Sequence, residues 1–297
     1  ALQDHAKVNR LGPVAGVGVG YGGPVDASTG CVIKSYQIEG WDNFPLASWL
    51  VRELGIPIAE IQNDADTAGL AEARYGAGKG LSPIFYVTIG SGIGGALIID
   101  GQIYRGAGRG ASEIGHLRVP VPGDQGQPHL RELEEIASGW GIGRGGQREA
   151  LRQIEEGCRD WSVLKTAGDP DGITGLMIAQ AAIRGDAISG RILDDAREAM
   201  AFALNQAIAL VAPRRIILGG GVSLLGVSEW HGPIQELVER DVFRPFRGQF
   251  DIVPPNLGEE VVVHGAIGLA HDAVTHGGRP NKMSIFDSAP DCTQDTS

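Results

Sequence analysis

The 297-residue chain contains few cysteines and no long apolar segment. Its three cysteines, Cys31, Cys158 and Cys292, are odd in number and far apart. This pattern indicates neither a disulfide framework nor a cysteine-based metal site, and it favours a reducing compartment. No stretch approaches twenty uninterrupted apolar residues, and no charged-then-apolar leader with a cleavage site is found. We therefore expect no membrane span and no export, and we expect the protein in the cytoplasm.

Positive charge is also scarce. The chain has 25 Lys and Arg against 36 Asp and Glu, a net charge of −11. This balance argues against a broad nucleic-acid surface, so no nucleic-acid partner is expected. The hydrophobic content of 42% is ordinary for a chain that buries a sizeable core. Glycine, in contrast, is abundant at 46 residues, which predicts many tight turns and close backbone approaches.

A glycine-rich turn, Gly90-Ser91-Gly92-Ile93-Gly94-Gly95, is the densest motif in the chain. It matches G-x-G-x-x-G, a weak signal for a dinucleotide site, which requires a strand before the glycines and a helix after them. The preceding residues 84–89 predict a strand. The following residues 96–100 form an apolar run ended by Asp-Gly, which predicts a second strand and a hairpin rather than a helix. The turn could therefore present bare N–H groups to phosphate, or it could be a plain glycine hairpin.

Three further motifs carry chemistry-bearing residues. Asn63-Asp64-Ala65 opens a predicted helix over residues 64–75, with Gly76 as its stop. Asp64 suits the helix macrodipole, and it could be a simple N-terminal cap or a catalytic carboxylate. Glu113-Ile114-Gly115-His116 follows later, where His116 alone could equally be a structural histidine. A strand predicted at 215–218 leads into Gly219-Gly220-Gly221-Val222.

The remaining chain is predicted to be largely helical. A strand is expected at 14–20 and another at 57–62. Residues 130–137 are expected to form a helix that ends at Ser138-Gly139, and residues 157–172 a loop-rich connection. Further helices are expected at 43–53, 173–184, 186–212 and 233–240, with a strand at 250–253.

Together with the turn Gly22-Gly23-Pro24-Val25-Asp26, these motifs resemble the ROK (repressor/ORF/kinase) family of sugar kinases and regulators, over about residues 14–270. The resemblance implies an α/β fold of the actin-like ATPase (ribonuclease H-like) type with two lobes. Residues 1–62 would form the remainder of the N-terminal lobe, with a last helix at about 259–274 packing back on it. Residues 63–258 would form the larger C-terminal lobe, and residues 275–297 a disordered tail.

The resemblance also implies ATP- and Mg²⁺-dependent phosphorylation of a hexose, with glucose ahead of fructose or N-acetylmannosamine, and a homodimer as the assembly. Asp64 would be the base that faces the sugar hydroxyl. The sugar would contact Asn63, Gly23, Glu113, His116 and Glu134, although Glu134 could be merely structural because its alignment crosses a changed loop. The nucleotide would contact the phosphate turn through Ser91, Gly92, Gly94 and Gly95, and its adenosine part would lie against Gly219, Gly220 and Gly221.

Two departures from the family pattern affect these expectations. Many members bind a structural zinc with three cysteines placed between the E-x-G-H and L-E motifs. No cysteine lies between His116 and Glu134 here, so no structural zinc is expected. Members also begin with a D-x-G-G-T phosphate loop that is absent from the thirteen residues before Val14. The N-terminal lobe is therefore expected to be incomplete in this chain, with weak turnover until upstream residues are restored.

A second function class stays open. The chain could be a non-catalytic sugar-binding protein or a transcriptional regulator of the same family. Retention of Asn63-Asp64 favours the kinase, whereas loss of the first phosphate loop favours binding alone. The sequence also leaves open which sugar is bound and whether ATP or polyphosphate is the phosphoryl donor.

Overall fold

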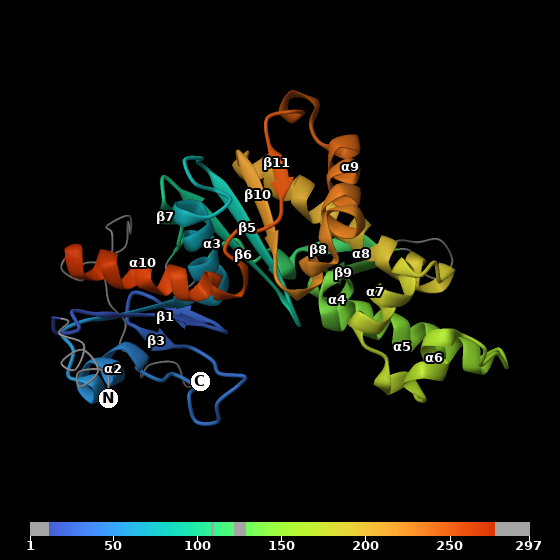
Figure 1. Ribbon diagram of the computed structural model, residues 1–297, viewed down its shortest axis with the longest axis horizontal. Coiled ribbons are helices and arrows are strands. Elements are labelled where there is room, and N and C mark those ends of the chain that lie inside the picture. The colour runs from blue at the N-terminus through green and yellow to red at the C-terminus, as the bar shows by residue number, and fades with distance from the viewer. Residues whose placement is uncertain (1–11, 108–109, 122–128, 277–297) are drawn as a thin grey trace. The chain divides into compact units, whose positions relative to one another are not determined.

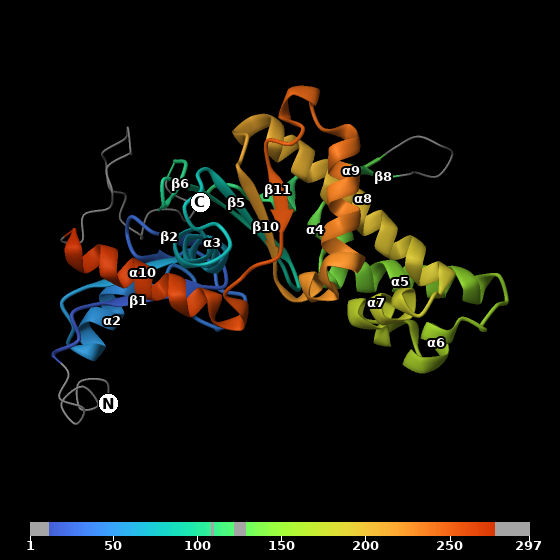
Figure 2. The same ribbon diagram turned by 45° about the horizontal axis from the view of Figure 1, so that its top comes forward.

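The computed structural model describes residues 12–107, 110–121 and 129–276, and the chain divides into two compact units (Figures 1 and 2). Unit 1 contains residues 1–81, 96–112 and 256–297, and unit 2 contains residues 82–95 and 113–255. The chain thus passes between the units after residues 81, 95, 112 and 255. This division differs from the boundary expected after residue 62, because helix 64–75 and residues 96–112 belong to unit 1.

Unit 1 is built on two parallel strands, β1 (Val17–Tyr21) and β4 (Ala59–Asn63). Helix α10 (Val261–Thr275) lies alongside β1, as Figure 1 shows. The contact is close because a Cβ at Gly18 would lie 1.8 Å from the carbonyl oxygen of Ala266. The alternating glycines of β1 therefore let the helix pack directly on the strand backbone.

A small aromatic cluster completes the core of unit 1. The short hairpin of β2 (Val25–Asp26) and β3 (Cys31–Val32) and helix α2 (Leu46–Leu54) pack near β4. Trp41 stacks on Phe44 with ring centroids 4.7 Å apart, and both rings pack against buried residues of this core.

Helix α3 (Asp64–Tyr75) connects several segments of unit 1. The carboxylate of Glu72 is fully buried and accepts hydrogen bonds from the backbone N–H groups of Asn256, Leu257 and Ala77, at 2.9, 2.8 and 2.7 Å. These bonds compensate the cost of burying the carboxylate. Glu72 therefore holds the residues near Ala77, shortly before the chain leaves unit 1 at residue 81, and those at Asn256, where the chain returns to it.

Unit 2 contains three parallel strands in the order β11 (Asp251–Val253), β10 (Arg215–Gly219) and β5 (Ile84–Ile89). β5 and residues 216–218 of β10 are apolar runs with mostly buried side chains, as is typical of parallel strands covered on both faces. Strand β6 (Ile93–Ile99) follows β5 after a three-residue turn. Its first residues belong to unit 2, and its last residues pair in unit 1 with β7 (Gln102–Ile103).

Helices make up most of the rest of unit 2. They are α4 (Glu134–Ala137), α5 (Gly139–Glu155), α6 (Ser162–Ala167), α7 (Gly175–Ile183), α8 (Ala187–Val211) and α9 (Gly232–Asp241). Figure 2 shows α5, α6 and α7 grouped together. An antiparallel hairpin joins β8 (Arg118–Val121) to β9 (His129–Glu132). Short helical turns occur at η1 (Ile114–His116), η3 (Pro170–Gly172), η4 (Gly221–Leu225), η5 (Val227–His231), η6 (Arg244–Phe246) and η7 (Gly258–Glu260).

Locally periodic segments agree with the sequence predictions, and two other predictions differ from the structure. Residues 84–89 and 64–75 form the predicted strand and helix. Residues 130–137 do not form one helix, because 129–132 pair with β8 and only 134–137 are helical. Ser138 ends α4 as predicted, and its hydroxyl also accepts a hydrogen bond from Gly141 N–H (2.9 Å) and so caps the next helix, α5. The connection over 157–172 contains α6.

Cys31 is disulfide-bonded, which the cysteine pattern did not predict, and Cys158 is a free, exposed thiol. Of the helices in the described ranges, none is both long enough and apolar enough to cross a membrane.

Candidate functional site

Asn63 and Asp64 lie where β4 ends and α3 begins. The N-cap of α3 is Asn63, whose Oδ1 accepts hydrogen bonds from the N–H groups of Ala65 (2.8 Å) and Asp66 (3.4 Å). The interpretation of Asp64 as a simple N-terminal cap was therefore wrong. Because Asn63 performs the capping, the Asp64 side chain is not required for that purpose.

The turn after β1 is attached to this helix start. Asn63 Nδ2 donates to the carbonyl oxygen of Gly23 at 3.2 Å, and a Cβ at Gly22 would lie 3.5 Å from Asp64 Oδ2. Gln37 donates from Nε2 to the carbonyl oxygen of Gly22. Asn63, Asp64 and Gly23, predicted from separate motifs, are thus brought together in unit 1.

The Asp64 carboxyl group is half-buried, and burial raises its pKa above the ordinary value of 3.8. Hydrogen bonds from backbone N–H groups, including that of Ala65 to Oδ1 at 2.8 Å, oppose this shift only in part. The positive end of the α3 dipole also favours the ionised form. A carboxylate with a raised pKa is a better proton acceptor than a solvent-exposed aspartate.

The two glycine segments of unit 2 lie at the same edge of its sheet. β5 and β10 are parallel with Thr88 opposite Gly219, so the turn at residues 90–92 and the residues 219–221 follow neighbouring carboxyl ends. Gly220 has φ +84°, and a Cβ there would lie 2.5 Å from the backbone nitrogen of Ile89. Ligands of open α/β sheets bind at such an edge.

The glycine turn itself joins two strands, as predicted, and no helix follows it. Gly90 N–H donates to the carbonyl oxygen of Gly92 at 2.9 Å. Ser91 is exposed, and a Cβ at Gly90 or at Gly221 would meet no atom within 4 Å. A ligand can therefore approach the backbone closely at both positions. The requirement of a Rossmann site for a helix after the glycines is not met.

The sequence reading missed one element beside the turn. The N–H of Gly139, the first residue of α5, donates to the carbonyl oxygen of Gly90 at 2.8 Å. The positive end of a 17-residue helix thus lies at the glycine turn. Ser138 could have indicated the start of a helix, because serine is a common N-cap residue. The five glycines of α5 lower its helix propensity, however, so no helix was predicted there.

Glu113 is the N-cap of the turn η1, and His116 is its last residue. This turn lies against the start of β6. Glu113 and His116 are both exposed, whereas Ile114 and Gly115 between them are buried. A Cβ at Gly115 would lie 2.2 Å from the carbonyl oxygen of Ile93, so only glycine permits this contact. The E-I-G-H motif is therefore attached to the residue that follows the glycine turn.

His116 pairs with Glu132, a residue that the sequence reading did not select. Its Nδ1 lies 3.1 Å from Glu132 Oε2. The hydrogen bond to Glu132 raises the pKa of His116 above 6.5, burial opposes this, and the charges of Glu132, Glu134 and Glu113 add to it. Glu132 lies on β9, in a segment predicted to be helical, so only the pairing of β8 with β9 in the folded chain identifies it.

Glu134 was predicted to contact the sugar, and its carboxylate reaches the glycine turn. Oε2 accepts a hydrogen bond from Ile93 N–H at 2.9 Å, and a Cβ at Gly92 would lie 2.5 Å from the same oxygen. Within unit 2 the structure thus brings together Glu113, Glu134, the turn at 90–95 and residues 219–221.

Nowhere in ranges 12–107, 110–121 and 129–276 do three His, Cys, Asp or Glu side chains gather as they would around a metal ion. Arg118 lies 3.6 Å from Glu132, so a positive charge already pairs with this carboxylate.

Comparisons with known proteins agree on one family. The sequence pattern of the ROK family matches residues 5–273. The glucokinase of Thermotoga maritima is 30% identical over 259 residues, which cover 87% of this chain and 80% of that protein. The crystal structure of a ROK family glucokinase from Streptomyces griseus in complex with glucose and AMPPNP superposes with a TM-score of 0.72 at 30% identity, covering 89% of this chain and 83% of that one. A ROK family transcriptional regulator, a homologue of the E. coli MLC protein, shares the fold with a TM-score of 0.74 at 20% identity, covering 92% of this chain and 66% of that one.

Proposed function

The chain belongs to the ROK family, with the actin-like ATPase fold of that family, and we propose that it is a sugar kinase that transfers the γ-phosphoryl group of ATP to a hydroxyl of a glucose-like hexose. The similarity to glucokinases at about 30% identity over most of the chain supports sugar kinase chemistry in general. The preference for glucose is the finer part of the proposal. The observation that carries it is the half-buried Asp64 at the start of α3, held beside Asn63 and the Gly22–Gly23 turn.

Asp64 would accept the proton of the sugar hydroxyl that attacks the γ-phosphorus. Phosphoryl transfer asks the protein mainly for positioning and charge stabilisation, with one carboxylate to take the proton. The raised pKa of Asp64 suits a proton acceptor, and the positive end of the α3 dipole favours the ionised form that accepts the proton.

The sugar would be recognised through paired hydrogen bonds from its hydroxyl groups. Asn63, Glu113, His116 and Glu134 supply carboxylate, amide and imidazole groups, and Gly23 supplies backbone. A site built of such groups rejects an analogue that lacks a hydroxyl by a factor on the order of 10⁴, because its buried polar groups are then left unpaired. Because the Nδ1–H of His116 donates to Glu132, Nε2 of the neutral imidazole would accept a hydrogen bond from a sugar hydroxyl.

The nucleotide would bind at the edge of the unit 2 sheet. The open space over Gly90 and Gly221 fits the close approach of phosphate and of the adenosine part to bare backbone. Ser91, Gly92, Gly94 and Gly95 would face the phosphates, and residues 219–221 the adenosine part. Mg²⁺ usually arrives on the phosphates with several water ligands, so it would neutralise the developing charge without a dedicated cage of protein side chains.

A coupled ADP-release assay over a panel of hexoses tests this proposal. The panel includes glucose, fructose, mannose and N-acetylmannosamine, each with ATP. Polyphosphate, which releases no ADP, is tested separately by measuring the sugar phosphate product. Sugar-dependent ADP release that is strongest with glucose is expected. Absence of sugar-dependent release with every hexose, combined with calorimetric binding of a hexose, would support the second candidate instead.

The second candidate is a sugar-binding regulator without phosphoryl transfer. It is favoured by the fold shared with the ROK transcriptional regulator. At 20% identity that similarity concerns the fold alone, whereas the glucokinase relatives reach 30%.

Assembly and location complete the proposal. We propose a homodimer in the cytoplasm, where a kinase of small sugars has access to ATP. Helices α7 and α8 carry four exposed apolar side chains that a second copy of the chain would cover in such a dimer. They are Leu176, Ile183, Phe202 and Leu210. Light scattering of the purified protein checks the assembly.

A further inference from the structure

Glu134 is in direct contact with the turn that is proposed to hold the phosphates. Its Oε2 is 2.9 Å from Ile93 N, which comes immediately after Gly92. Ile93 is buried at 5% exposure, so its N–H has little access to water. A buried N–H that loses its acceptor is costly, and the bond from Glu134 therefore determines the conformation of this part of the turn.

Ile93 also makes a close contact through its carbonyl oxygen. Gly115 of the E-I-G-H motif lies against the carbonyl oxygen of Ile93, where a Cβ would be only 2.2 Å away. Ile93 thus lies between α4, which carries Glu134, and η1, which carries Glu113 and His116 at its ends. The segments expected to bind sugar are attached to the backbone of the phosphate turn.

We propose that Glu134 is a positioning residue for the glycine turn, holding Ile93 N–H so that the neighbouring N–H groups face the nucleotide phosphates. This inference rests on the proposed kinase function. Among the described residues Glu134 makes its hydrogen bond through Oε2, and Oε1 is available to a sugar hydroxyl. A sugar bound there restrains the carboxylate that holds the turn, which links sugar occupancy to the geometry of the phosphate site.

Two variants separate the hydrogen bond from the negative charge. In Glu134→Gln the amide oxygen can still accept from Ile93 N–H, although the charge is lost. In Glu134→Ala both are lost. Removing the charge by itself should strengthen the binding of an anionic nucleotide, so the comparison of the two variants isolates the hydrogen bond.

Calorimetric binding of Mg·AMPPNP in the absence of sugar is the deciding measurement. We expect Glu134→Gln to bind as tightly as the wild type or more tightly, and Glu134→Ala to bind at least about tenfold more weakly than Glu134→Gln. Glu135→Ala is the matched control, because Glu135 is the next residue of α4 and pairs with Arg131 instead of the turn. It should bind as the wild type does.

Amide hydrogen exchange of the peptide that covers the turn provides a second measurement if Glu134→Ala does not fold. The Ile93 amide should be protected in the wild type and in Glu134→Gln, and should exchange at least about tenfold faster in the shorter Glu134→Asp. Equal nucleotide affinity of the Ala and Gln variants, or equal exchange in all three proteins, would overturn the inference while leaving the kinase proposal intact. Failure of the wild type to bind any nucleotide would overturn both.

Discussion

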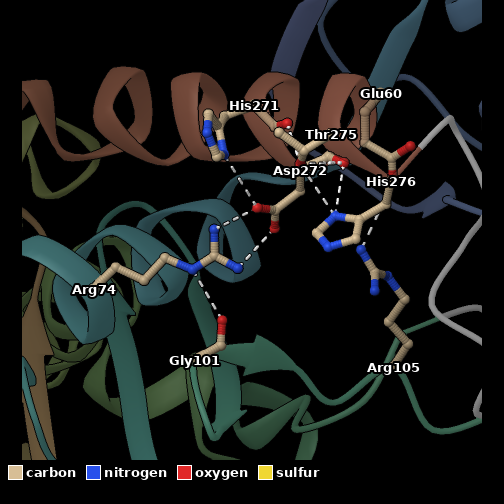
Figure 3. A network of polar contacts seen from close by, with 8 residues as sticks. All are labelled: Glu60, Arg74, Gly101, Arg105, His271, Asp272, Thr275 and His276. Atoms are coloured by element: carbon tan, nitrogen blue, oxygen red, sulfur yellow. Dashed lines mark hydrogen bonds and ion pairs between the residues drawn. The ribbon is translucent and has the colours of Figure 1, made fainter.

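Arg74 of α3 and Asp272 of α10 form a two-bond ion pair. Nη1 lies 3.0 Å from Oδ1 and Nη2 lies 2.7 Å from Oδ2 (Figure 3). Nε of Arg74 also donates to the carbonyl oxygen of Gly101 at 2.9 Å. The helix that begins with Asp64 is thus fixed at its other end to α10 and to the turn between β6 and β7.

Removal of this ion pair should destabilise unit 1. Arg74→Gln is expected to lower the free energy of unfolding by about 2 kcal/mol, since charged hydrogen bonds are lost at side chains only 17% and 28% exposed. Arg52→Gln, which breaks the exposed pair with Glu53, should change it by less than about 0.5 kcal/mol. Urea unfolding measures both.

The pH dependence of the Arg74 effect has a defined sign. Burial acts to raise the pKa of Asp272, but hydrogen bonding to Arg74 and the nearby positive charges outweigh it, so the net pKa lies below 3.8. A lowered folded-state pKa contributes stability above the unfolded value and loses it as the pH falls through the folded value. The difference between the wild type and Arg74→Gln should therefore shrink below about pH 4.

The assignment of Asp64 as the base predicts a selective loss of turnover. Asp64→Asn should leave the sugar Kd within a few fold and lower kcat by a factor on the order of 10² or more. Asp42→Asn is a suitable control because Asp42 is an exposed carboxylate of unit 1 that pairs with Lys34. Near-normal kcat in Asp64→Asn would falsify the base assignment.

The raised pKa of Asp64 predicts two pH effects. Because the base must be ionised, the acidic limb of kcat should lie above pH 3.8. A raised folded-state pKa contributes stability below the unfolded pKa and loses it as the pH rises through the folded value, so the ionised carboxylate destabilises the fold at neutral pH. Asp64→Asn should consequently melt at a higher temperature than the wild type at pH 7, and the gap should close near pH 3. A lower melting temperature at pH 7 would contradict this.

The Glu132 contact predicts the titration of His116. In Glu132→Gln the pKa of His116 should fall toward 6.5, because the largest cause of its rise is the hydrogen bond to Glu132. The stability that this pair contributes is fully present below pH 6.5 and is lost as the pH rises through the higher folded-state value. NMR titration of the histidine rings measures the shift, with Glu135→Gln as the control. An unchanged His116 pKa would show that the two side chains do not pair in solution.

The metal content is a separate prediction. The purified protein should contain no stoichiometric zinc, and chelators should leave its Tm unchanged, because residues 117–133 contain no cysteine. Elemental analysis checks this directly. One zinc per chain would contradict the prediction and would implicate His116 and His129 with nearby carboxylates.

Features that depend on neighbouring residues were predictable from the sequence. The β-branched run at 84–89 and the strand at 215–218 form where expected, and the Asp-Gly after residue 99 correctly indicated a strand–turn–strand around the glycines. The motif order also indicated the family, which the comparisons confirm. Such signals lie within a few residues of one another, so no knowledge of the folded chain is needed to recognise them.

The contacts that define the site were decided by tertiary structure. Asn63 bonds Gly23, forty residues away, and Glu134 bonds Ile93, forty-one residues away. The pairing of β8 with β9 overrode the local helical pattern at 129–132 and placed Glu132 against His116. Helix α5 forms despite its five glycines because Ser138 caps it and its first N–H bonds Gly90. Local sequence specifies which conformations a segment favours, whereas burial and hydrogen bonding to distant segments select among them, and those partners are known only once the chain is folded.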